Sequence, residues 1–171
     1  VLRKFPNIHT SIFLMIGFPR ETVAQIKDTI NLATDMDMDW YRISQLHPLP
    51  GTPIYDAMVQ QGMIQSTGSS DVRFNGGAFG KQSAIEADAV QSETRFEEVF
   101  SNLSPDIVPA PEILADIWFY MNYRLNFFRI FSEQNPVKRK QLKAHLEILA
   151  DLISPENGFA LYFLAWLSMR E

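Results

Sequence analysis

The fold of this chain is decided by one stretch, Ile8-His9-Thr10-Ser11-Ile12-Phe13-Leu14-Met15-Ile16-Gly17-Phe18-Pro19, a mostly apolar run that ends in a Gly-Phe-Pro turn. Its second half shows no alternation of apolar and polar residues, which favours a parallel strand over residues 8–17 that is buried on both faces. Thr22 and Gln25 follow at capping-box spacing and predict the start of a helix. The apolar face of that helix is made by Val23, Ile26, Ile30 and Ala33.

A second strand is predicted at Trp40-Tyr41-Arg42-Ile43-Ser44-Gln45-Leu46, which is rich in aromatic and apolar residues. Strand, helix and strand together predict one βαβ unit, and such a crossover is nearly always right-handed. A proline-rich turn over residues 47–53 ends the second strand. Thr52 and Pro53 then predict the start of a short helix that stops at Gly62.

Beyond residue 64 the pattern changes to helices alone. Small polar residues over 65–85 predict a loop, and a weakly amphipathic helix is expected at 86–100. Three more apolar helices are expected at 112–131, at 136–153 and from Pro155 to the C-terminal end, packed together as a small bundle. We therefore predict an α/β fold that changes to all-α and is helix-dominated overall. The expected domains are residues 1–64, a linker with the weak helix at 65–108, and a helical domain at 109–171.

The composition narrows the classes of function. The chain has 171 residues, a net charge of −5 and no cysteine. An acidic balance argues against nucleic-acid binding, which needs clustered Lys and Arg. The absence of cysteine excludes disulfides and any Cys-ligated cluster held by this chain alone, and it favours a reducing, cytoplasmic location. Neither aromatic helix is a plausible membrane span, because one carries internal charges and the other has too few apolar residues.

Two motifs carry a family resemblance. The first is Phe13-Leu14-Met15-Ile16-Gly17-Phe18-Pro19-Arg20-Glu21-Thr22, and the second is Pro48-Leu49-Pro50-Gly51-Thr52-Pro53-Ile54-Tyr55, one helix and one strand later. Together they resemble the radical S-adenosylmethionine (radical SAM) superfamily, and most closely its members that also carry a cobalamin-binding domain. The resemblance covers residues 8–62. It implies that the two strands are the fifth and sixth strands of a partial (β/α) barrel of the TIM-barrel kind.

The resemblance also implies a site at the carboxyl ends of the two strands, where barrel enzymes bind their ligands. The residues expected to line an S-adenosylmethionine pocket there are Ile16, Gly17, Pro19, Glu21, Arg42, Ile43, Ser44 and His47. Gly17 would let the backbone approach the ligand, and Ile16 or Ile43 would offer an apolar contact to adenine. The helix start at Thr22 is expected to supply free backbone N–H groups, with Glu21 at its positive end.

The chain departs from the family pattern in one decisive respect. The family holds a [4Fe–4S] cluster with the three cysteines of a CxxxCxxC motif, and this chain has none. Since the sequence also begins at Val1 and runs directly into a structured pattern, we expect the C-terminal part of a longer enzyme, inactive by itself. The parent enzyme would use S-adenosylmethionine, the iron–sulfur cluster and cobalamin. Its small-molecule substrate would be methylated, cyclised or rearranged at an unreactive carbon.

Two other interpretations stay open. A methylthiotransferase or another radical SAM class shares the Gly-Pro-Glu-Thr element. Alternatively, residues 109–171 form a helical binding or oligomerisation module without catalysis, because their aromatic residues are denser than a small bundle needs. A homo-oligomer could then form through the aromatic helices or through an open strand edge.

The candidate residues also have a purely structural interpretation, in which they bind no ligand. Gly17 and Pro19 could form a turn and nothing more, His47 could bond a local carbonyl, and Arg42 could be solvated at the rim of the sheet. No metal site is predicted, because the three histidines at positions 9, 47 and 145 are scattered in the sequence.

Two further patterns are rejected as sites. Asp35, Asp37 and Asp39 lack the Gly and the distal Glu of a calcium loop, so we expect a solvated connection between helix and strand. Residues 75–82 approach a phosphate-binding loop, but Asn75 replaces its first Gly and Gln82 replaces its hydroxyl residue.

Overall fold

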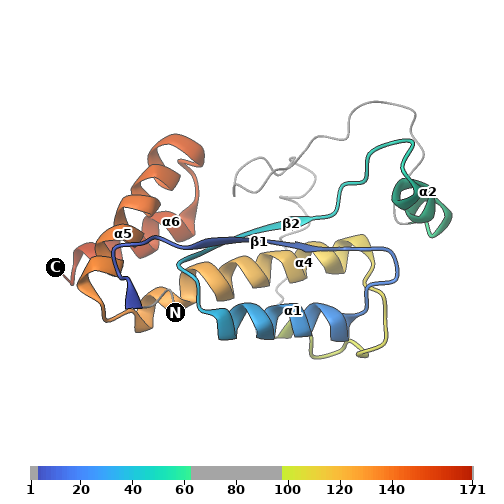
Figure 1. Ribbon diagram of the computed structural model, residues 1–171, viewed down its shortest axis with the longest axis horizontal. Helices are drawn as coiled ribbons and strands as arrows, with labels where there is room; N and C mark the ends of the chain where they lie inside the picture. Colours follow the sequence, from blue (N-terminus) through green and yellow to red (C-terminus); the bar gives the residue numbers. More distant parts are fainter. Residues whose placement is uncertain (1–3, 63–97, 171) are drawn as a thin grey trace.

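The computed structural model describes residues 4–62 and 98–170 (Figure 1). Over these residues a two-stranded parallel sheet is followed by helices, and helix dominates, as predicted. The elements are β1 (Ser11–Ile16), α1 (Val23–Met36), β2 (Trp40–Gln45), α2 (Pro53–Gln60), α4 (Pro111–Asn122), the π-helical turn η3 (Tyr123–Phe127), the 3₁₀ turn η4 (Phe128–Ser132), α5 (Pro136–Ile148), the π-helical turn η5 (Leu149–Ile153) and α6 (Gly158–Ser168). The predicted loop at 65–85, most of the helix predicted at 86–100 and the phosphate-loop-like residues 75–82 lie outside the described residues.

The predicted βαβ unit is confirmed. β1 and β2 are parallel, with Ser11 opposite Trp40 and Ile16 opposite Gln45. The capping box of α1 is formed, since the Thr22 side chain accepts the Gln25 N–H and the Gln25 side chain accepts the Thr22 N–H. The buried residues of α1 are Val23, Ile26, Ile30 and Ala33, which is the face expected from helical periodicity.

Both α1 and α4 cover the same face of the sheet (Figure 1). The core between these two helices and the strands includes Ile16 and Ile43 from the sheet, Ile26 from α1, and Ile117 and Met121 from α4. This core therefore joins residues from both sides of the expected domain boundary at 65–108.

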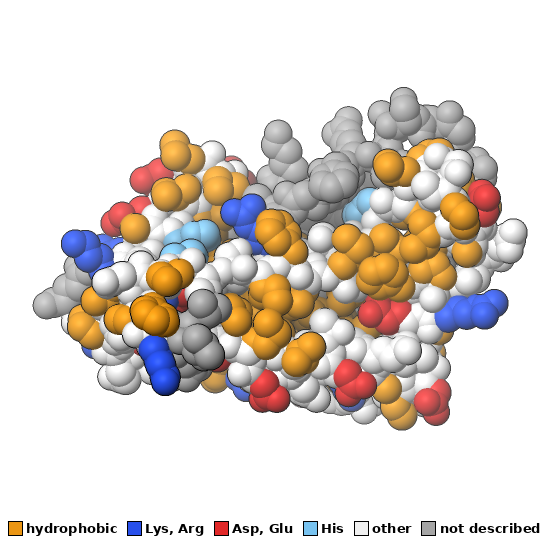
Figure 2. Space-filling view, viewed as in Figure 1, with side chains coloured by type: hydrophobic (Ala, Val, Ile, Leu, Met, Phe, Trp, Pro, Cys, Tyr) orange, Lys and Arg blue, Asp and Glu red, His pale blue; other side chains and the backbone are white. Residues whose placement is uncertain are grey.

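The prediction that the first strand is buried on both faces is wrong. Burial alternates along β1, and Phe13 is 71% exposed while Met15 is 44% exposed. Helices α1 and α4 cover one face of this strand, so Ile16 is buried and Ile12 and Leu14 are partly buried, whereas the residues that point to the other face reach the surface. Figure 2 shows hydrophobic side chains at the surface along the strands.

The outer edge of β2 is closed by side chains from α4 and η3. Asn126 is fully buried, its Oδ1 accepts the Tyr41 N–H at 2.7 Å, and its Nδ2 donates to the Tyr41 carbonyl at 2.9 Å. Trp118 Nε1 donates to the Ile43 carbonyl at 2.7 Å. These groups take the hydrogen bonds that a further strand would make, so β2 is a terminal strand.

The edge of β1 that faces away from β2 has no such cover in the described part of the chain. In a parallel pair, alternate residues turn their N–H and C=O groups to opposite sides, and the bonds from Trp40 N–H to Thr10 and from Leu46 N–H to Ile16 fix the phase. The N–H and C=O groups of Ser11, Phe13 and Met15 therefore point outward. A further strand can therefore pair with the outer edge of β1, but not with the outer edge of β2 at Tyr41.

A second core joins the C-terminal helices to the start of β2. It holds Trp40 together with Phe127 and Phe163, which pack with ring centroids 5.6 Å apart, and with Leu142 and Leu146 of α5. The predicted bundle packing is thus observed, but the helix predicted at 112–131 changes to a π turn at Tyr123.

Two other helix boundaries differ from their predictions. The helix predicted over 136–153 changes to a π turn at Leu149, and the last helix starts at Gly158 rather than Pro155 because Asn157 caps it. No helix among the described residues is long and apolar enough to cross a membrane.

Candidate functional site

The turn after β1 is held in an unusual backbone conformation. Gly17 has φ +88° and Arg20 has φ +65°, so the chain passes twice through the left-handed region within four residues. The Gly17 N–H donates to Glu21 Oε2 at 2.5 Å, and the Phe18 N–H donates to the same oxygen at 3.1 Å. Glu21 therefore folds back over the turn, and it brings the end of β1 beside the start of α1.

The prediction that the helix start supplies free N–H groups is wrong for this structure. Glu21 accepts the N–H groups of the turn, and Gln25 accepts that of Thr22. The next two donors are used as well, because Val23 N–H donates to the Ile107 carbonyl and Ala24 N–H donates to the Pro105 carbonyl, each at 2.9 Å. A segment far along the chain thus satisfies the amides that a ligand would otherwise take.

Two of the expected pocket residues point into the core instead of toward a ligand. Ile16 is fully buried and Ile43 is 1% exposed, and both pack against α1 and α4. An apolar contact from either side chain to adenine is therefore not available in this arrangement. Sequence periodicity alone did not assign a face to these residues, because the strand is apolar on both faces.

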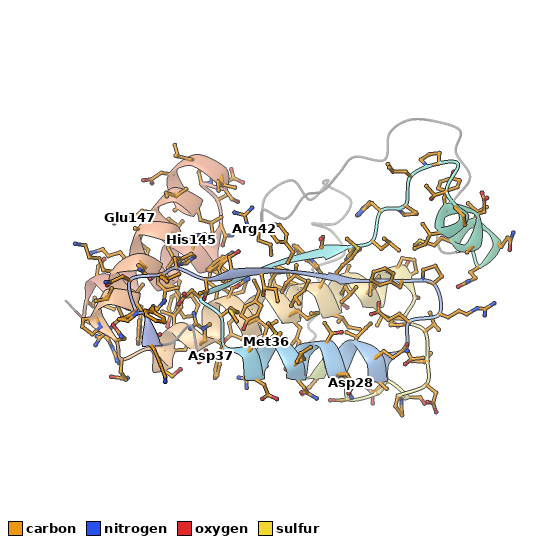
Figure 3. The ribbon with its side chains drawn as sticks, in the orientation of Figure 1. Asp28, Met36, Asp37, Arg42, His145 and Glu147 are labelled. Atoms are coloured by element: carbon orange, nitrogen blue, oxygen red, sulfur yellow. The ribbon has the colours of Figure 1, made fainter. Side chains whose placement is uncertain are left out.

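The polar candidates lie on the open face of the sheet and at its carboxyl end. Arg42 is exposed, and its guanidinium carbon lies 5.3 Å from the Phe13 ring centroid on the neighbouring strand. Figure 3 shows Arg42 on the side of the strands away from α1. Ser44 shares that face and is half-buried, with its hydroxyl 3.5 Å from the Leu14 carbonyl. We define Phe13, Met15, Arg42 and Ser44 as the open sheet face.

The remaining two candidates make local contacts. Nδ1 of His47 lies 2.9 Å from the Gln45 carbonyl oxygen, and the ring is exposed. This contact agrees with the structural interpretation of His47, in which it bonds a local carbonyl. Pro19 is half-buried in the turn between Gly17 and Glu21. The structure thus brings Gly17, Pro19, Glu21 and His47 to one end of the sheet, whereas Arg42 lies in the middle of β2.

Comparison with known proteins adds no family to this geometry. No protein-family model matches the chain. No solved structure matches it significantly.

A second polar cluster lies at the amino ends of the strands, where no site was predicted from the sequence. The His9 and His145 rings stack with centroids 5.5 Å apart, and His145 also packs 4.2 Å from the Trp40 ring. Lys138 Nζ donates to Asp39 Oδ2 at 2.7 Å and to the Ile8 carbonyl. Residues scattered along the sequence meet here because α5 crosses the beginning of both strands.

The electrostatics of this cluster follow from burial and from neighbouring charge. Burial is the main cause that lowers the pKa of His145, the nearby His9 and Arg42 act in the same direction, and together they bring this pKa to about 4. Burial also lowers the pKa of His9, although the Asp39 carboxylate partly opposes the change. Both imidazoles are therefore held neutral at pH 7.

Asp39 corrects the prediction of a solvated acidic connection. Its side chain is buried and accepts hydrogen bonds from the Thr10 N–H and hydroxyl, each at 2.7 Å, and from Lys138. Burial alone raises the pKa of Asp39, but these bonds outweigh it and the net pKa is lowered. Asp37 is likewise engaged, since its carboxylate lies 3.5 Å from Arg129. No group of three or more His, Asp or Glu residues able to hold a metal is present in the described ranges.

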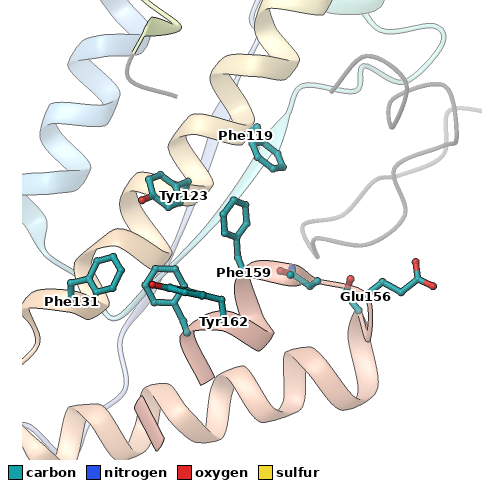
Figure 4. Close-up of a pocket in the computed structure, with 10 residues that line it drawn as sticks. Phe119, Tyr123, Phe131, Glu156, Phe159 and Tyr162 are labelled. Atoms are coloured by element: carbon teal, nitrogen blue, oxygen red, sulfur yellow. The ribbon is translucent and has the colours of Figure 1, made fainter. Parts of the chain in front are cut away.

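The third feature is a pocket between the C-terminal helices, with a volume of about 740 Å³. Figure 4 shows Phe119 and Tyr123, from α4 and η3, facing Phe159 and Tyr162 of α6. Glu156 lies at the side of the pocket, on the turn before α6. The aromatic density of these helices was visible in the sequence, but it indicated core packing or an interface, not a concave site.

Proposed function

We propose that this chain is the C-terminal part of a radical SAM enzyme of the cobalamin-dependent class, with the open sheet face forming one wall of the S-adenosylmethionine pocket. The motif pair at 13–22 and 48–55 motivates the proposal. The observation that carries it is a parallel βαβ unit with α1 and α4 on one face. The other face is apolar and exposed at Phe13 and Met15, and α5 packs on its amino end at Trp40. In a (β/α) barrel, helices cover the outside and strand side chains line the inside.

The two edges of the sheet are consistent with an open barrel. β2 is terminal, because Asn126 and Trp118 occupy its outer edge. β1 can still accept a neighbouring strand, which would continue the sheet beyond its outer edge. A closed barrel would need a partner on both sides, so the arrangement favours the partial barrel.

The residues of this chain fit the implied cofactors unequally. Without cysteine the chain does not fit the [4Fe–4S] cluster, so the cluster would be held by residues outside this sequence. For S-adenosylmethionine, the Arg42 guanidinium is suited to bind a carboxylate, and the Ser44 hydroxyl can donate to a polar atom of the ligand. The turn amides at Gly17 and Phe18 cannot do so while Glu21 accepts their hydrogen bonds.

The first experiment is to read the coding sequence upstream of Val1. The proposal expects a CxxxCxxC motif there, and an upstream sequence without one would overturn it. The second experiment uses the full-length protein, reconstituted with iron and sulfide without oxygen and then reduced. Mass spectrometry should detect 5′-deoxyadenosine formed from S-adenosylmethionine.

The role of the open sheet face is tested in the same full-length protein with Arg42→Ala. We expect S-adenosylmethionine to bind about tenfold more weakly, because a hydrogen bond to a charged group contributes about 1.5–3 kcal/mol. The matched control is Asp28→Ala, which changes an exposed charge on the far side of α1 (Figure 3) and should leave the affinity unchanged. Equal affinities for the two variants would refute the assignment of this face.

A second candidate function, self-association without catalysis, is favoured by exposed apolar side chains at the C-terminal end. Leu152 and Met169 are each 79% exposed, and Leu161 is 49% exposed. Such a surface is typical of an interaction site. Sedimentation of the chain at increasing concentration tests this function: a dimer that dissociates in Leu161→Gln supports it, and a monomer at high concentration excludes it.

A further inference from the structure

We propose that the pocket between α4, η3 and α6 binds a small organic cation, a substituted ammonium group on an apolar body. This inference is independent of the proposed function, because the pocket involves none of the residues of the open sheet face. Its volume of about 740 Å³ lies within the range of small-molecule sites.

The lining of the pocket is mainly aromatic. Aromatic rings converge from separate elements, with the Phe159 centroid 5.7 Å from Phe119 and 5.5 Å from Tyr123. Tyr162, one turn further along α6, is 57% exposed and keeps much of its ring surface at the pocket (Figure 4). The faces of such rings carry negative electrostatic potential and attract cations, and cages of this kind recognise quaternary ammonium groups.

The charged side chains around the pocket also favour a cation. Glu156 lines the pocket, and none of the ten lining residues that the structure describes is basic. The nearest arginines in the sequence have other partners. The Arg124 guanidinium lies 4.7 Å from the Phe128 centroid, and Arg129, two residues before Phe131, donates to the Asp39 carbonyl at 2.9 Å. The described lining thus carries one acidic and no basic side chain, which favours a positively charged ligand over an anion.

Asp116 is an acidic residue of α4, one helical turn before the lining residue Phe119. It precedes Phe119 by three residues and Tyr123 by seven, which puts it on the same face of the helical segment, less than two turns away. Burial raises the pKa of its carboxyl, and it makes no ion pair with another described residue. A carboxylate that has lost hydration without gaining a cationic partner is stabilised when a cation binds nearby.

The test compares three probes of one shape and different charge. Choline is the cation, 3,3-dimethyl-1-butanol is its neutral isostere, and 3,3-dimethylbutanoate is the anion. Each is titrated into the chain while amide and aromatic resonances are followed by NMR. We expect saturable shifts at Phe159 and Tyr162 with choline, binding of the alcohol about fivefold weaker or worse, and no saturation with the anion.

Variants then separate the two contributions. Tyr162→Leu removes a half-exposed ring without emptying the core and should weaken choline binding at least about threefold. Glu156→Gln should weaken choline and leave the neutral alcohol unchanged. The matched control is Glu147→Gln, an exposed carboxylate on α5 (Figure 3), which should change neither.

Three outcomes would overturn the inference. Equal affinity for choline and the alcohol would mean an apolar pocket without charge selectivity. Preference for the anion would assign the site to the amino end of α6 instead. Choline shifts that persist in Tyr162→Leu would mean that the cation binds elsewhere.

Discussion

The side chain of Asn126 substitutes for a neighbouring strand, and its replacement gives the most direct test of the fold. In Asn126→Leu the number and branching of the side-chain heavy atoms are kept, but the Tyr41 N–H and C=O lose the partners that now lie 2.7 and 2.9 Å away. Each buried backbone group that loses its bond costs about 1–3 kcal/mol, so we expect the free energy of unfolding to fall by about 2–6 kcal/mol. A small domain has only about 5–15 kcal/mol in total.

The assay is urea unfolding followed by tryptophan fluorescence, with hydrogen exchange at the Tyr41 amide as a local readout. The matched control is Asn31→Leu, the same change at an exposed position of α1, which should stay within about 0.5 kcal/mol. A loss of less than about 1 kcal/mol in Asn126→Leu would refute the reasoning. It would mean that water or another group takes over the edge of β2.

Asn126→Asp keeps the acceptor for the Tyr41 N–H and removes the donor to its carbonyl, and it stays informative where the leucine variant does not fold. Burial would raise the pKa of the new carboxyl, so the folded state would bind the proton more tightly than the unfolded state. The variant should therefore be more stable at low pH than at neutral pH, relative to the wild type. A difference between the two proteins that does not vary with pH would contradict the burial of this position.

Three further predictions concern the turn and the cluster at the amino ends of the strands. Gly17→Ala should lower the free energy of unfolding by about 1–3 kcal/mol, because φ is +88° and the new Cβ would lie 2.6 Å from Leu114 Cδ2. The pKa of His145 is lowered from 6.5 to about 4, so its neutral form stabilises the fold near pH 7, and the urea midpoint should fall as pH drops from 6.5 toward 4. Asp39→Asn should cost about 2–4 kcal/mol, because it leaves the Lys138 ammonium without its buried partner.

Each of these predictions has a control variant or a control measurement. Gly51→Ala has nearly the same backbone angle, φ +83°, with nothing within 4 Å, so the excess cost of Gly17→Ala reports the contact with Leu114. His145→Gln should flatten the pH dependence between 4 and 6.5, and an unchanged slope would contradict the role of this ring. The pKa of Asp39 is lowered, so its stabilisation is lost only as pH falls below the ordinary carboxyl range. In a plot of the urea midpoint against pH, Asp39→Asn should therefore reduce the slope only at the acid end of the pH range.

The sequence predicted the elements whose causes are local. Helix α1 was predicted from Thr22 and Gln25, which meet within one turn, and from an apolar spacing that any helix turns to one side. The short helix after Pro53 follows from the fixed φ of proline and the Thr52 cap. These signals need no knowledge of what lies elsewhere in the chain, and the structure agrees with them.

The candidate site was predicted less well, because its geometry depends on distant partners. The amides at the start of α1 looked available, but Pro105 and Ile107 accept two of them from far along the chain. Asp39 looked solvated, yet α5 brings Lys138 onto it. The two helix-to-π changes were also invisible to periodicity, since their residues continue the apolar pattern of the preceding helix.

The sequence by itself thus determined a parallel βαβ unit followed by helices, an acidic chain without cysteine, and the turn at Gly17. Only the tertiary structure decided which face of the sheet is covered and which edge is closed. The physical reason is that β1 is apolar on both sides, so its own residues cannot assign a face. That choice is made by α4 and by Asn126, whose bonds to Tyr41 span 85 residues.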